Sequence, residues 1–475
     1  MTKKETIYNI LKVSISNLLK LFSGVMVGFL LPKIIGVSDY GYYKTFTLYA
    51  AYVGLFHFGI ADGIYLKYGD KDYDELNKKA FRYYSKYLLV IEICISIVIA
   101  VLSSFLLTGE LRFIFICVAI YLTAINITSY YQFISQITNR FNELSIRNII
   151  SSVLTIMILV FMAVVKRLSA SLLSYRIYLI MYVMIVIILA AWYIYTYKDI
   201  TFGETEKLKN SVIKEFIMLG FPLMLSSLCT SLILTIDRQF VSILFDINTY
   251  AIYAFAYSML SLVTTAVSAI STVLYPTLKR ADEDSFIKAY EKLVAGIQIL
   301  IFGCLLLYFP LVFIVKSFLP QYLDSLVIFR IIFPGLVMSS VITIVIHNYY
   351  KTIGWNSKFF IKSIITLGIS FLANMIAYVI FKTTESISVA SIITLVLWYL
   401  IVEFDLVKQY KVRWKRNLLY VLMMSFVFYL ITSLNNIILS SILYIIGFLC
   451  ISASFYINSH YFNFKELIRK NKRGM

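Results

Sequence analysis

Stretches of mostly apolar residues recur along the whole chain, each about twenty residues long, which is enough to cross a bilayer as a helix. Because the lipid interior offers no water to unpaired backbone groups, such runs cross membranes as α-helices. The sequence therefore predicts an all-α integral membrane protein with about fourteen transmembrane helices. The predicted spans lie near residues 10–31, 45–66, 87–107, 113–136, 148–165, 173–197, 214–236, 248–275, 293–315, 329–350, 361–381, 386–406, 417–434 and 437–459.

The charge pattern predicts how these spans are oriented. Charged residues make up only 14% of the chain, yet the net charge is +18. Lys and Arg show a roughly threefold bias towards the loops on one side, and basic loops stay in the cytoplasm. The alternation places both termini in the cytoplasm. It also explains the positive charge without nucleic acid as a partner.

The sequence contains no motif for a disulfide framework, a metal site, a phosphate-binding loop or a catalytic centre. The five cysteines lie in apolar stretches and none is spaced as CxxC. No cluster of His, Cys, Asp and Glu has the spacing of metal ligands, and no GxxxxGK[ST] phosphate loop is present. No nucleophile-and-base arrangement stands out. The sequence predicts no metal, no cofactor and no catalytic residue.

A short segment occurs twice and indicates an internal repeat. IGVSDYGYY (35–43) aligns with FDINTYAIY (245–253), so that Tyr40 pairs with Tyr250 and Tyr43 pairs with Tyr253. Each segment joins the first and second spans of a six-span block, and an even-numbered block repeats with the same topology. The prediction is an N-terminal six-helix lobe over 1–200 and a C-terminal six-helix lobe over 201–411. Helices 13 and 14 with a basic tail follow at 412–475.

Lys20 is the clearest charged residue inside a span. It lies about ten residues into the first span, which at 1.5 Å per residue places it about 15 Å deep, near the midplane. A charge at that depth usually faces a bundle interior or a watery cavity. Lys20 is therefore a candidate for binding an anion in a central cavity, with Ser16 beside it at helical spacing. Lys12 lies on the same helix face as Ser16 and Lys20, but its long side chain is expected to reach the membrane interface and so needs no cavity.

Four further charged residues are candidates for coupling or gating. Glu92 in the third span could neutralise Lys20 or carry a coupling proton, or it could be a solvated carboxylate near the interface. Asp62 closes the second span and is either a coupling residue or an interfacial one. Asp237 and Arg238 end the seventh span and form either an outer gate or a solvated corner.

Uncharged polar residues supply the remaining cavity candidates. Tyr257 and Ser261 belong to a polar stripe on the eighth span, and His347 and Asn374 lie in the tenth and eleventh. A stripe on one helix face is typical of a water-filled lumen, whereas single hydroxyls often bond only to their own helix. The sequence leaves both interpretations open.

Three stretches carry a family resemblance: GFLLPKIIGVSDYGYY (28–43), HFGIADGIYLKYG (57–69), and GFPLMLSSL followed by TIDRQFVSILFDINTYAIYAFAYSM (220–259). The chain resembles the O-antigen and polysaccharide flippases of the multidrug/oligosaccharidyl-lipid/polysaccharide exporter superfamily. The resemblance implies a MATE-like pair of six-helix lobes around a central cavity, with two extra helices, in the inner (cytoplasmic) membrane of a bacterium. It also implies an undecaprenyl-pyrophosphate-type lipid-linked glycan as substrate, and polysaccharide polymerase and chain-length machinery as partners. Lys20 matches an expected cationic cavity, and Arg238 and Lys44 could complete it.

Two other functions stay in competition with a flippase. A drug or cation exporter of the same superfamily would have an acidic cavity, against which Lys20 argues and which Glu92 and Asp237 leave open. A polysaccharide polymerase or ligase would be an enzyme with a large outer loop, and no predicted outer loop is long. The hypothesis carried forward is a flippase that works by alternating access for O-antigen, lipopolysaccharide or capsule assembly, and that is not an enzyme.

Overall fold

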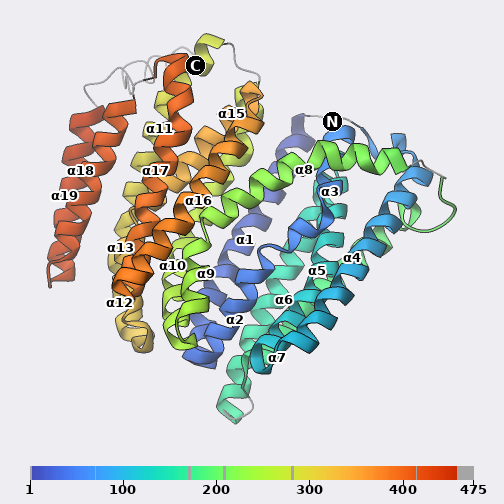
Figure 1. Ribbon diagram of the computed structural model, residues 1–475, viewed down its shortest axis with the longest axis horizontal. Coiled ribbons are helices and arrows are strands. Elements are labelled where there is room, and N and C mark those ends of the chain that lie inside the picture. Colours follow the sequence, from blue (N-terminus) through green and yellow to red (C-terminus); the bar gives the residue numbers. More distant parts are fainter. Residues whose placement is uncertain are drawn as a thin grey trace. The chain divides into compact units, whose positions relative to one another are not determined.

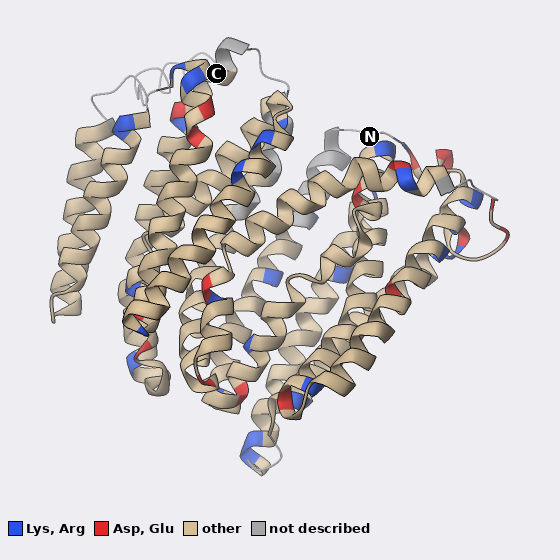
Figure 2. Ribbon diagram, in the orientation of Figure 1, with Lys and Arg blue, Asp and Glu red and all other residues tan. Residues whose placement is uncertain are grey.

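The computed structural model describes residues 3–69, 71–169, 173–206, 210–279, 283–412 and 414–456, and all regular structure in these ranges is helical. Two compact units are present, Met1–Phe255 and Ala256–Met475. Figure 1 traces the helices of each unit, and Figure 2 shows charged residues gathered near helix ends with long uncharged stretches between them. That distribution is the one a lipid environment requires.

The first unit contains α1 to α9 and the start of α10. Its elements are α1 (Lys3–Ile35), α2 (Val37–Ala50), η1 (Val53–His57), α3 (Ile60–Tyr68), η2 (Tyr73–Glu75), α4 (Lys78–Leu106), α5 (Gly109–Ile137), α6 (Phe141–Leu168), α7 (Tyr175–Thr196), η4 (Lys198–Ile200), α8 (Asn210–Ile233), α9 (Ile236–Leu244) and the first turns of α10 (Ile247–Lys279). Helix α5 is central, because α2, α4 and α7 all pack on it, and α1 packs along α6.

The second unit contains the rest of α10 and all later helices. They are α11 (Glu283–Cys304), η5 (Leu305–Leu307), α12 (Tyr308–Phe318), η6 (Pro320–Tyr322), α13 (Ser325–Ile332), α14 (Leu336–Ser340), the π-helical turn η7 (Val341–Ile346), α15 (His347–Ile353), α16 (Asn356–Phe381), α17 (Thr384–Tyr410), α18 (Trp414–Thr432) and α19 (Ile437–Tyr456). Here α16 packs along α17, and α18 packs on α19.

The membrane-spanning character of the chain agrees with the prediction, whereas the number of spans is not fixed. Ten of the described helices are long and apolar enough to cross a membrane. The count is eleven if Ser325–Ile332 and Leu336–Ile353, bent by 52° at Pro334, form one span. Each of the fourteen predicted segments overlaps described helix. Fourteen spans, and the lobe boundaries at 200 and 411, stay predictions.

The second predicted span is not one continuous helix. Helix α2 ends at Ala50, a 3-10 turn follows, and α3 begins at Ile60. Phe58 and Gly59 both have left-handed backbones, with φ of 51° and 75°. Two such residues in succession cannot continue a right-handed helix, which explains the break.

Close contact with α8 accompanies this break. A Cβ atom on Gly63 would lie 2.2 Å from the Phe216 carbonyl oxygen, and a Cβ on Gly220 would lie 1.9 Å from the Gly59 carbonyl oxygen. The backbones of α3 and α8 therefore touch where glycines leave room, as small residues allow at helix crossings in membranes. An ion pair of 2.8 Å between Lys67 and Glu215 closes the same helix pair at one end.

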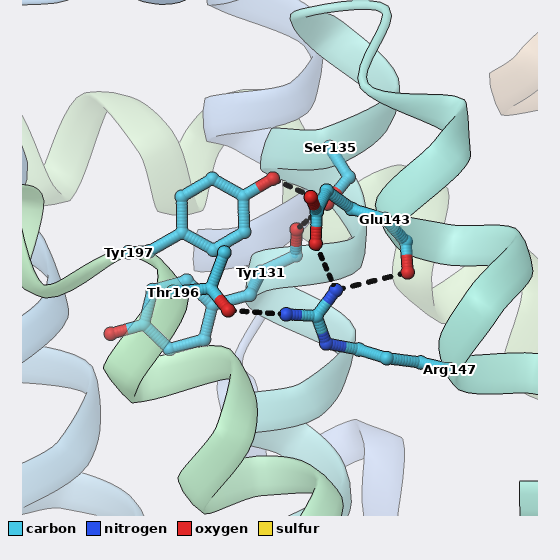
Figure 3. A network of polar contacts seen from close by, with 6 residues as sticks. All are labelled: Tyr131, Ser135, Glu143, Arg147, Thr196 and Tyr197. Atoms are coloured by element: carbon cyan, nitrogen blue, oxygen red, sulfur yellow. Dashed lines mark hydrogen bonds and ion pairs between the residues drawn. The ribbon is translucent and has the colours of Figure 1, made fainter. Parts of the chain in front are cut away.

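A buried arginine ties α6 to α7 at the end of the first unit that is predicted to be cytoplasmic (Figure 3). Arg147 is 2% exposed, and its Nη1 lies 2.5 Å from a Glu143 carboxylate oxygen. Its Nη2 donates to the Thr196 hydroxyl at 2.5 Å. The guanidinium carbon is 4.6 Å from the Trp192 ring and 4.2 Å from the Tyr193 ring. The planar guanidinium therefore bonds at its edge and stacks on its faces, which a lysine cannot reproduce.

We expect Arg147→Lys to lower the free energy of unfolding by about 2 kcal/mol, because charge-assisted hydrogen bonds and ring stacking are lost together. The measurement is thermal or denaturant unfolding of the purified chain in one detergent. Arg167→Lys, at the exposed opposite end of α6, is the matched control. Equal stability of the two variants would contradict this role for Arg147.

Candidate functional site

The two copies of the repeated segment meet inside the first unit. Helix α2 begins at Val37 and α10 begins at Ile247, which are equivalent positions of the repeat. A Cβ on Gly41 would lie 2.6 Å from the Ile247 carbonyl oxygen, so the two backbones touch. The Tyr250 hydroxyl donates to the Lys44 carbonyl oxygen at 3.2 Å. The two copies of the repeat are therefore in direct contact, where α2 and α10 begin.

The Asp246 carboxylate anchors one side of this corner. It accepts hydrogen bonds from the amides of Asn248 and Thr249 and from the Thr249 hydroxyl. The Thr249 hydroxyl is the largest influence and, with the backbone amides, holds the pKa of Asp246 below its usual range. The side chain therefore caps α10 as an anion, which suits a helix N-terminus.

Two cations lie in this corner region, which we call the corner layer (Lys44, Asp237, Arg238, Tyr40, Tyr43, Tyr250 and Tyr253). The Lys44 ammonium lies 5.2 Å from the centre of the Tyr40 ring and 5.7 Å from that of Tyr43. Among the described residues it has no carboxylate partner, and the charge that acts on it is that of Arg238. Rings beside an ammonium stabilise it less than an ion pair does. Lys44 can therefore still bind an anion.

Asp237 and Arg238 are packed into the unit and do not form a solvated corner. Asp237 is 2% exposed, and its carboxylate accepts a hydrogen bond of 2.8 Å from the Tyr253 hydroxyl. The Arg238 guanidinium donates to the Leu234 carbonyl oxygen at 2.6 Å. Both residues lie on α9, where Asp237 contacts α10 and Arg238 contacts the turn after α8, and their role as an outer gate stays a prediction.

The break in the second span faces a break between α8 and α9. The Tyr52 hydroxyl and the Thr235 hydroxyl lie 2.5 Å apart, and Gln239 donates to Tyr52 at 3.1 Å. A cavity of about 170 Å³ lies beside this contact. Broken helices expose backbone polar groups and are tolerated in membranes where they line a cavity. Interrupted spans that line a cavity are found at the binding sites of transporters.

Two titratable residues line that cavity. His57 Nε2 lies 3.7 Å from an Asp62 carboxylate oxygen, and His57 Nδ1 accepts a hydrogen bond from the Gly59 amide at 3.1 Å. Ser227 and Ser231 of α8 line the opposite wall. Asp62 thus lies at the helix break with a histidine partner. His57 was not among the predicted site residues, and the signal for it in the sequence is its place five residues before Asp62 in a glycine-rich stretch.

Glu92 is buried and bonded to the helix break. It is 0% exposed, and its Oε2 accepts a hydrogen bond of 2.8 Å from Asn126. The same Asn126 amide donates to the Val53 carbonyl oxygen of the 3-10 turn at 3.0 Å. Glu92 Oε1 has no hydrogen-bond partner among the described residues. The partner of Glu92 here is Asn126, not Lys20, and Asn126 is a residue that sequence reasoning missed.

Lys20 and Ser16, which were predicted to share a cavity, differ in their exposure. The Lys20 side chain is exposed, and its ammonium has no hydrogen-bond or ion-pair partner among the described residues. Ser16, one turn earlier, is 0% exposed. Lys12 reaches α6, where its ammonium donates to the Asn142 side chain at 2.7 Å. Lys20 is therefore available to a ligand, whereas Ser16 is covered.

The remaining candidates lie in the second unit. Ser261 is exposed, and its hydroxyl donates to the Ser258 carbonyl oxygen of its own helix. Tyr257 is half-buried. His347 follows the π-helical turn and stacks on the Phe359 ring at 4.4 Å.

Asn374 is fully buried between α16 and α17. It donates to its own helix at the Ser370 carbonyl oxygen and accepts a hydrogen bond from Ser391 on α17 at 3.4 Å. These contacts join two packed helices.

Two acidic residues on α17 were not among the predicted site residues. Glu403 on α17 is 2% exposed and accepts a hydrogen bond of 3.1 Å from the Tyr290 hydroxyl. Nearby on the same helix, Asp405 pairs with Lys362 at 3.0 Å and accepts from Tyr350 at 3.2 Å. The signal was present in the sequence as two acids inside the predicted span 386–406. In the described ranges, no group of three His, Cys, Asp or Glu residues could hold a metal ion.

These features define a multi-pass membrane protein whose helix breaks and intramembrane charges are those of a transporter fold. The chain belongs to the polysaccharide biosynthesis protein family, whose sequence profile matches residues 3–282. This confirms the resemblance inferred from the sequence. No curated protein matches the chain.

Solved structures share the fold at low sequence identity. The inward closed conformation of the lipid II flippase MurJ matches with a TM-score of 0.66 and 16% identity, over 95% of this chain and 99% of that one. An inward-facing multidrug resistance MATE family transporter of the MOP superfamily matches with a TM-score of 0.59 and 15% identity, over 85% and 99%. A MOP superfamily transporter from Pyrococcus furiosus gives 0.52 and 13%, over 85% and 96%. The predicted MATE-like fold class is confirmed.

Proposed function

We propose that this protein is a flippase that moves a polyprenyl-pyrophosphate-linked oligosaccharide repeat unit from the cytoplasmic to the outer leaflet, for assembly of a cell-surface polysaccharide. The observation that carries the proposal is the corner layer, in a chain of the polysaccharide biosynthesis family. Lys44 and Arg238 place two basic side chains close together, next to the ends of predicted spans, and among the described residues no carboxylate pairs with Lys44. A pyrophosphate is the anion that such a pair would bind.

The size of the cavity in the first unit supports separate roles for the helix breaks and for the cations. The cavity of about 170 Å³ at the helix breaks has room for a handful of waters, not for an oligosaccharide. We therefore propose that the helix breaks act as hinges and that the cations Lys44 and Arg238 bind the pyrophosphate of the substrate. The prenyl tail stays in the lipid, where burial of each CH₂ is favourable by about 0.8 kcal/mol. In this scheme Glu92, Asp62, Asp237 and Arg238 couple or gate the motion.

The comparisons support a transporter of a lipid-linked substrate and not an enzyme. One solved structure of the same fold is named a lipid II flippase, and two others are transporters of the MOP superfamily. The proposed setting is the bacterial inner membrane with both termini in the cytoplasm. Polymerase and chain-length machinery would take the flipped unit. Alternating access stays the proposed mechanism, and Lys20, Tyr257, Ser261 and His347 stay candidate substrate-binding residues.

We expect Lys44→Gln and Lys20→Ala each to lower glycan export by roughly tenfold to a hundredfold, since a charged hydrogen bond contributes about 1.5–3 kcal/mol. The folded protein should be present in the membrane at its normal level, because neither ammonium has an ion-pair partner among the described residues. Export is measured as surface polysaccharide per unit of membrane protein. Lys316→Gln, exposed at the end of α12, is the control for loss of one charge. Normal export by Lys44→Gln would contradict the proposal that the corner layer binds the substrate.

A further inference from the structure

A groove lies on the first unit between α4 and α7. Both helices pack on α5, which forms the floor, and Figure 1 shows the three running beside one another. Near the end predicted to be cytoplasmic, the groove holds a pocket of about 230 Å³. Leu88 and Leu89 of α4, Ile127 of α5 and Ile194 of α7 line it, and Phe202 lies at its mouth with 59% of its surface exposed.

The polar groups of the pocket wall are already paired. Ser85 Oγ lies 3.1 Å from the Tyr130 hydroxyl and 3.1 Å from the Ile200 carbonyl oxygen. The hydroxyls of Tyr131 and Thr201 lie 2.6 Å apart. A ligand in the pocket would gain no hydrogen bonds from these groups, so an apolar chain fits it better than a sugar or a nucleotide.

Three cations lie on the pocket wall or on the segments next to it: Lys86 lines the pocket, Arg82 lies one turn before it on α4, and Lys198 begins the turn η4 after α7. The Lys86 ammonium donates to the Gly203 carbonyl oxygen at 3.1 Å, and Arg82 donates to the Asp199 carbonyl oxygen at 2.8 Å. The Lys198 ammonium lies 5.5 Å from the Tyr195 ring. Within the described part of the chain, these three cations bond only to neutral groups. They therefore present charge that is not cancelled by an ion pair.

The acidic residues of the same loop are held by other bases. Asp199 pairs with Lys78 at 3.0 Å, and Glu204 lies 3.8 Å from Lys79. Burial raises the pKa of Asp199, but hydrogen bonds from Tyr73 and Lys78 outweigh it, so that this pKa lies below its usual range. Asp199 thus stays ionised and bound to Lys78, which leaves Lys86, Arg82 and Lys198 to an outside anion.

Next to the pocket, one face of α4 carries partly exposed and exposed apolar residues. Leu89, Ile93 and Ile97 recur every four residues and so share one face of α4. Ile93 is 41% exposed and Ile97 is 56% exposed. An acyl chain entering the pocket would have a continuous apolar track beside α4.

We propose that this groove binds one acyl chain of an anionic phospholipid of the cytoplasmic leaflet, with the phosphate at Lys86, Arg82 and Lys198. The charge complementarity at the mouth selects an anionic headgroup, and the apolar wall takes the chain. The site is separate from the corner layer and from the helix breaks, and it does not depend on the substrate that the protein transports.

The test uses the full chain purified in detergent, with native mass spectrometry to count bound phosphatidylglycerol and phosphatidylcholine. We expect the wild type to retain phosphatidylglycerol in preference to phosphatidylcholine. Lys86→Gln should weaken phosphatidylglycerol binding about fivefold, the effect of one base near a membrane surface. Leu89→Trp should fill the pocket and abolish the preference. The matched controls are Leu102→Trp, 51% exposed farther along α4, and Lys382→Gln, exposed after α16, and neither should change it.

Unfolding curves in lipid-free detergent separate lost binding from lost folding. If Leu89→Trp unfolds, the proposal is tested by the lipid preference of Lys86→Gln alone. Equal retention of both lipids by the wild type would overturn the proposal, and so would an unchanged preference in Lys86→Gln. Displacement of phosphatidylglycerol by a polyprenyl phosphate in the wild type, but not in Leu89→Trp, would assign the groove to the carrier lipid and would also overturn it.

Discussion

Gly220→Ala should lower the free energy of unfolding by about 3 kcal/mol, at the upper end of what overpacking by a single methyl usually costs. The added Cβ would lie 1.9 Å from the Gly59 carbonyl oxygen and 2.5 Å from the Gly63 amide nitrogen. Both neighbours are backbone atoms, so no side-chain rotation relieves the clash. Either α3 and α8 move apart, or the break in the second span changes its geometry.

Gly368→Ala is the matched control for this first prediction. Gly368 lies inside α16, and a Cβ there would meet nothing within 4 Å. Replacing an exposed helical glycine by alanine usually stabilises a helix by about 1 kcal/mol. The two variants should therefore shift unfolding in opposite directions in the same detergent. A Gly220→Ala protein as stable as Gly368→Ala would show that the α3–α8 backbones are not in contact.

Glu92→Gln should reduce glycan export by at least about tenfold, equivalent to about 1.4 kcal/mol, while the protein stays folded. A glutamine keeps the shape of the side chain, and its amide oxygen can still accept the hydrogen bond from Asn126. What it loses is the ability to exchange a proton or attract a cation. Because Asn126 also holds the Val53 carbonyl oxygen, a change of charge at Glu92 is transmitted to the broken span.

Two other variants separate coupling from packing at Glu92. Glu385→Gln removes an exposed acid from the first turn of α17 and should leave export unchanged. Asn126→Ala releases Val53 and should lower stability as well as export. Wild-type export by Glu92→Gln, measured per folded molecule, would exclude Glu92 as a coupling residue.

The sequence predicted the helical membrane fold because its signal is physical and local. Runs such as residues 417–464 contain no Asp, Glu, Lys or Arg, and a bilayer admits them only as helices. The repeat also anticipated that the helices beginning at Val37 and Ile247 start at equivalent points. Both features depend on residues close together in the chain.

The break in the second span could not be predicted in the same way. Residues 45–66 are apolar throughout most of their length, and a hydropathy pattern does not distinguish one helix from two with a turn between them. The break depends on Gly59 and Gly63 meeting Gly220, which is far away in the sequence. Only the spacing of the two glycines by four residues hinted at a close helix crossing.

The sequence predicted which charged residues belong to the candidate site, but not the side chains that they contact. Lys20, Glu92, Asp62, Asp237 and Arg238 were recognised because charge is costly in lipid. Asn126 and Tyr253, which donate hydrogen bonds to Glu92 and Asp237, are uncharged and carry no signal in the sequence, because packing between helices decides which side chains meet. His57, which lies 3.7 Å from Asp62, is equally ambiguous in the sequence. Arg147 directly precedes the predicted span 148–165, and nothing in that position indicated that its side chain is buried against Trp192 and Tyr193.

The most direct measurement follows lipid-linked glycans in cells that lack this protein. The lipid-linked repeat units are extracted, and their leaflet is determined by access of an impermeant probe to intact and inverted membrane vesicles. The proposal predicts that complete units accumulate on the cytoplasmic leaflet, that the wild-type chain clears them, and that Lys44→Gln does not. Complete units already on the outer leaflet, or no accumulation at all, would contradict the flippase and favour an exporter of the same fold or a polysaccharide polymerase.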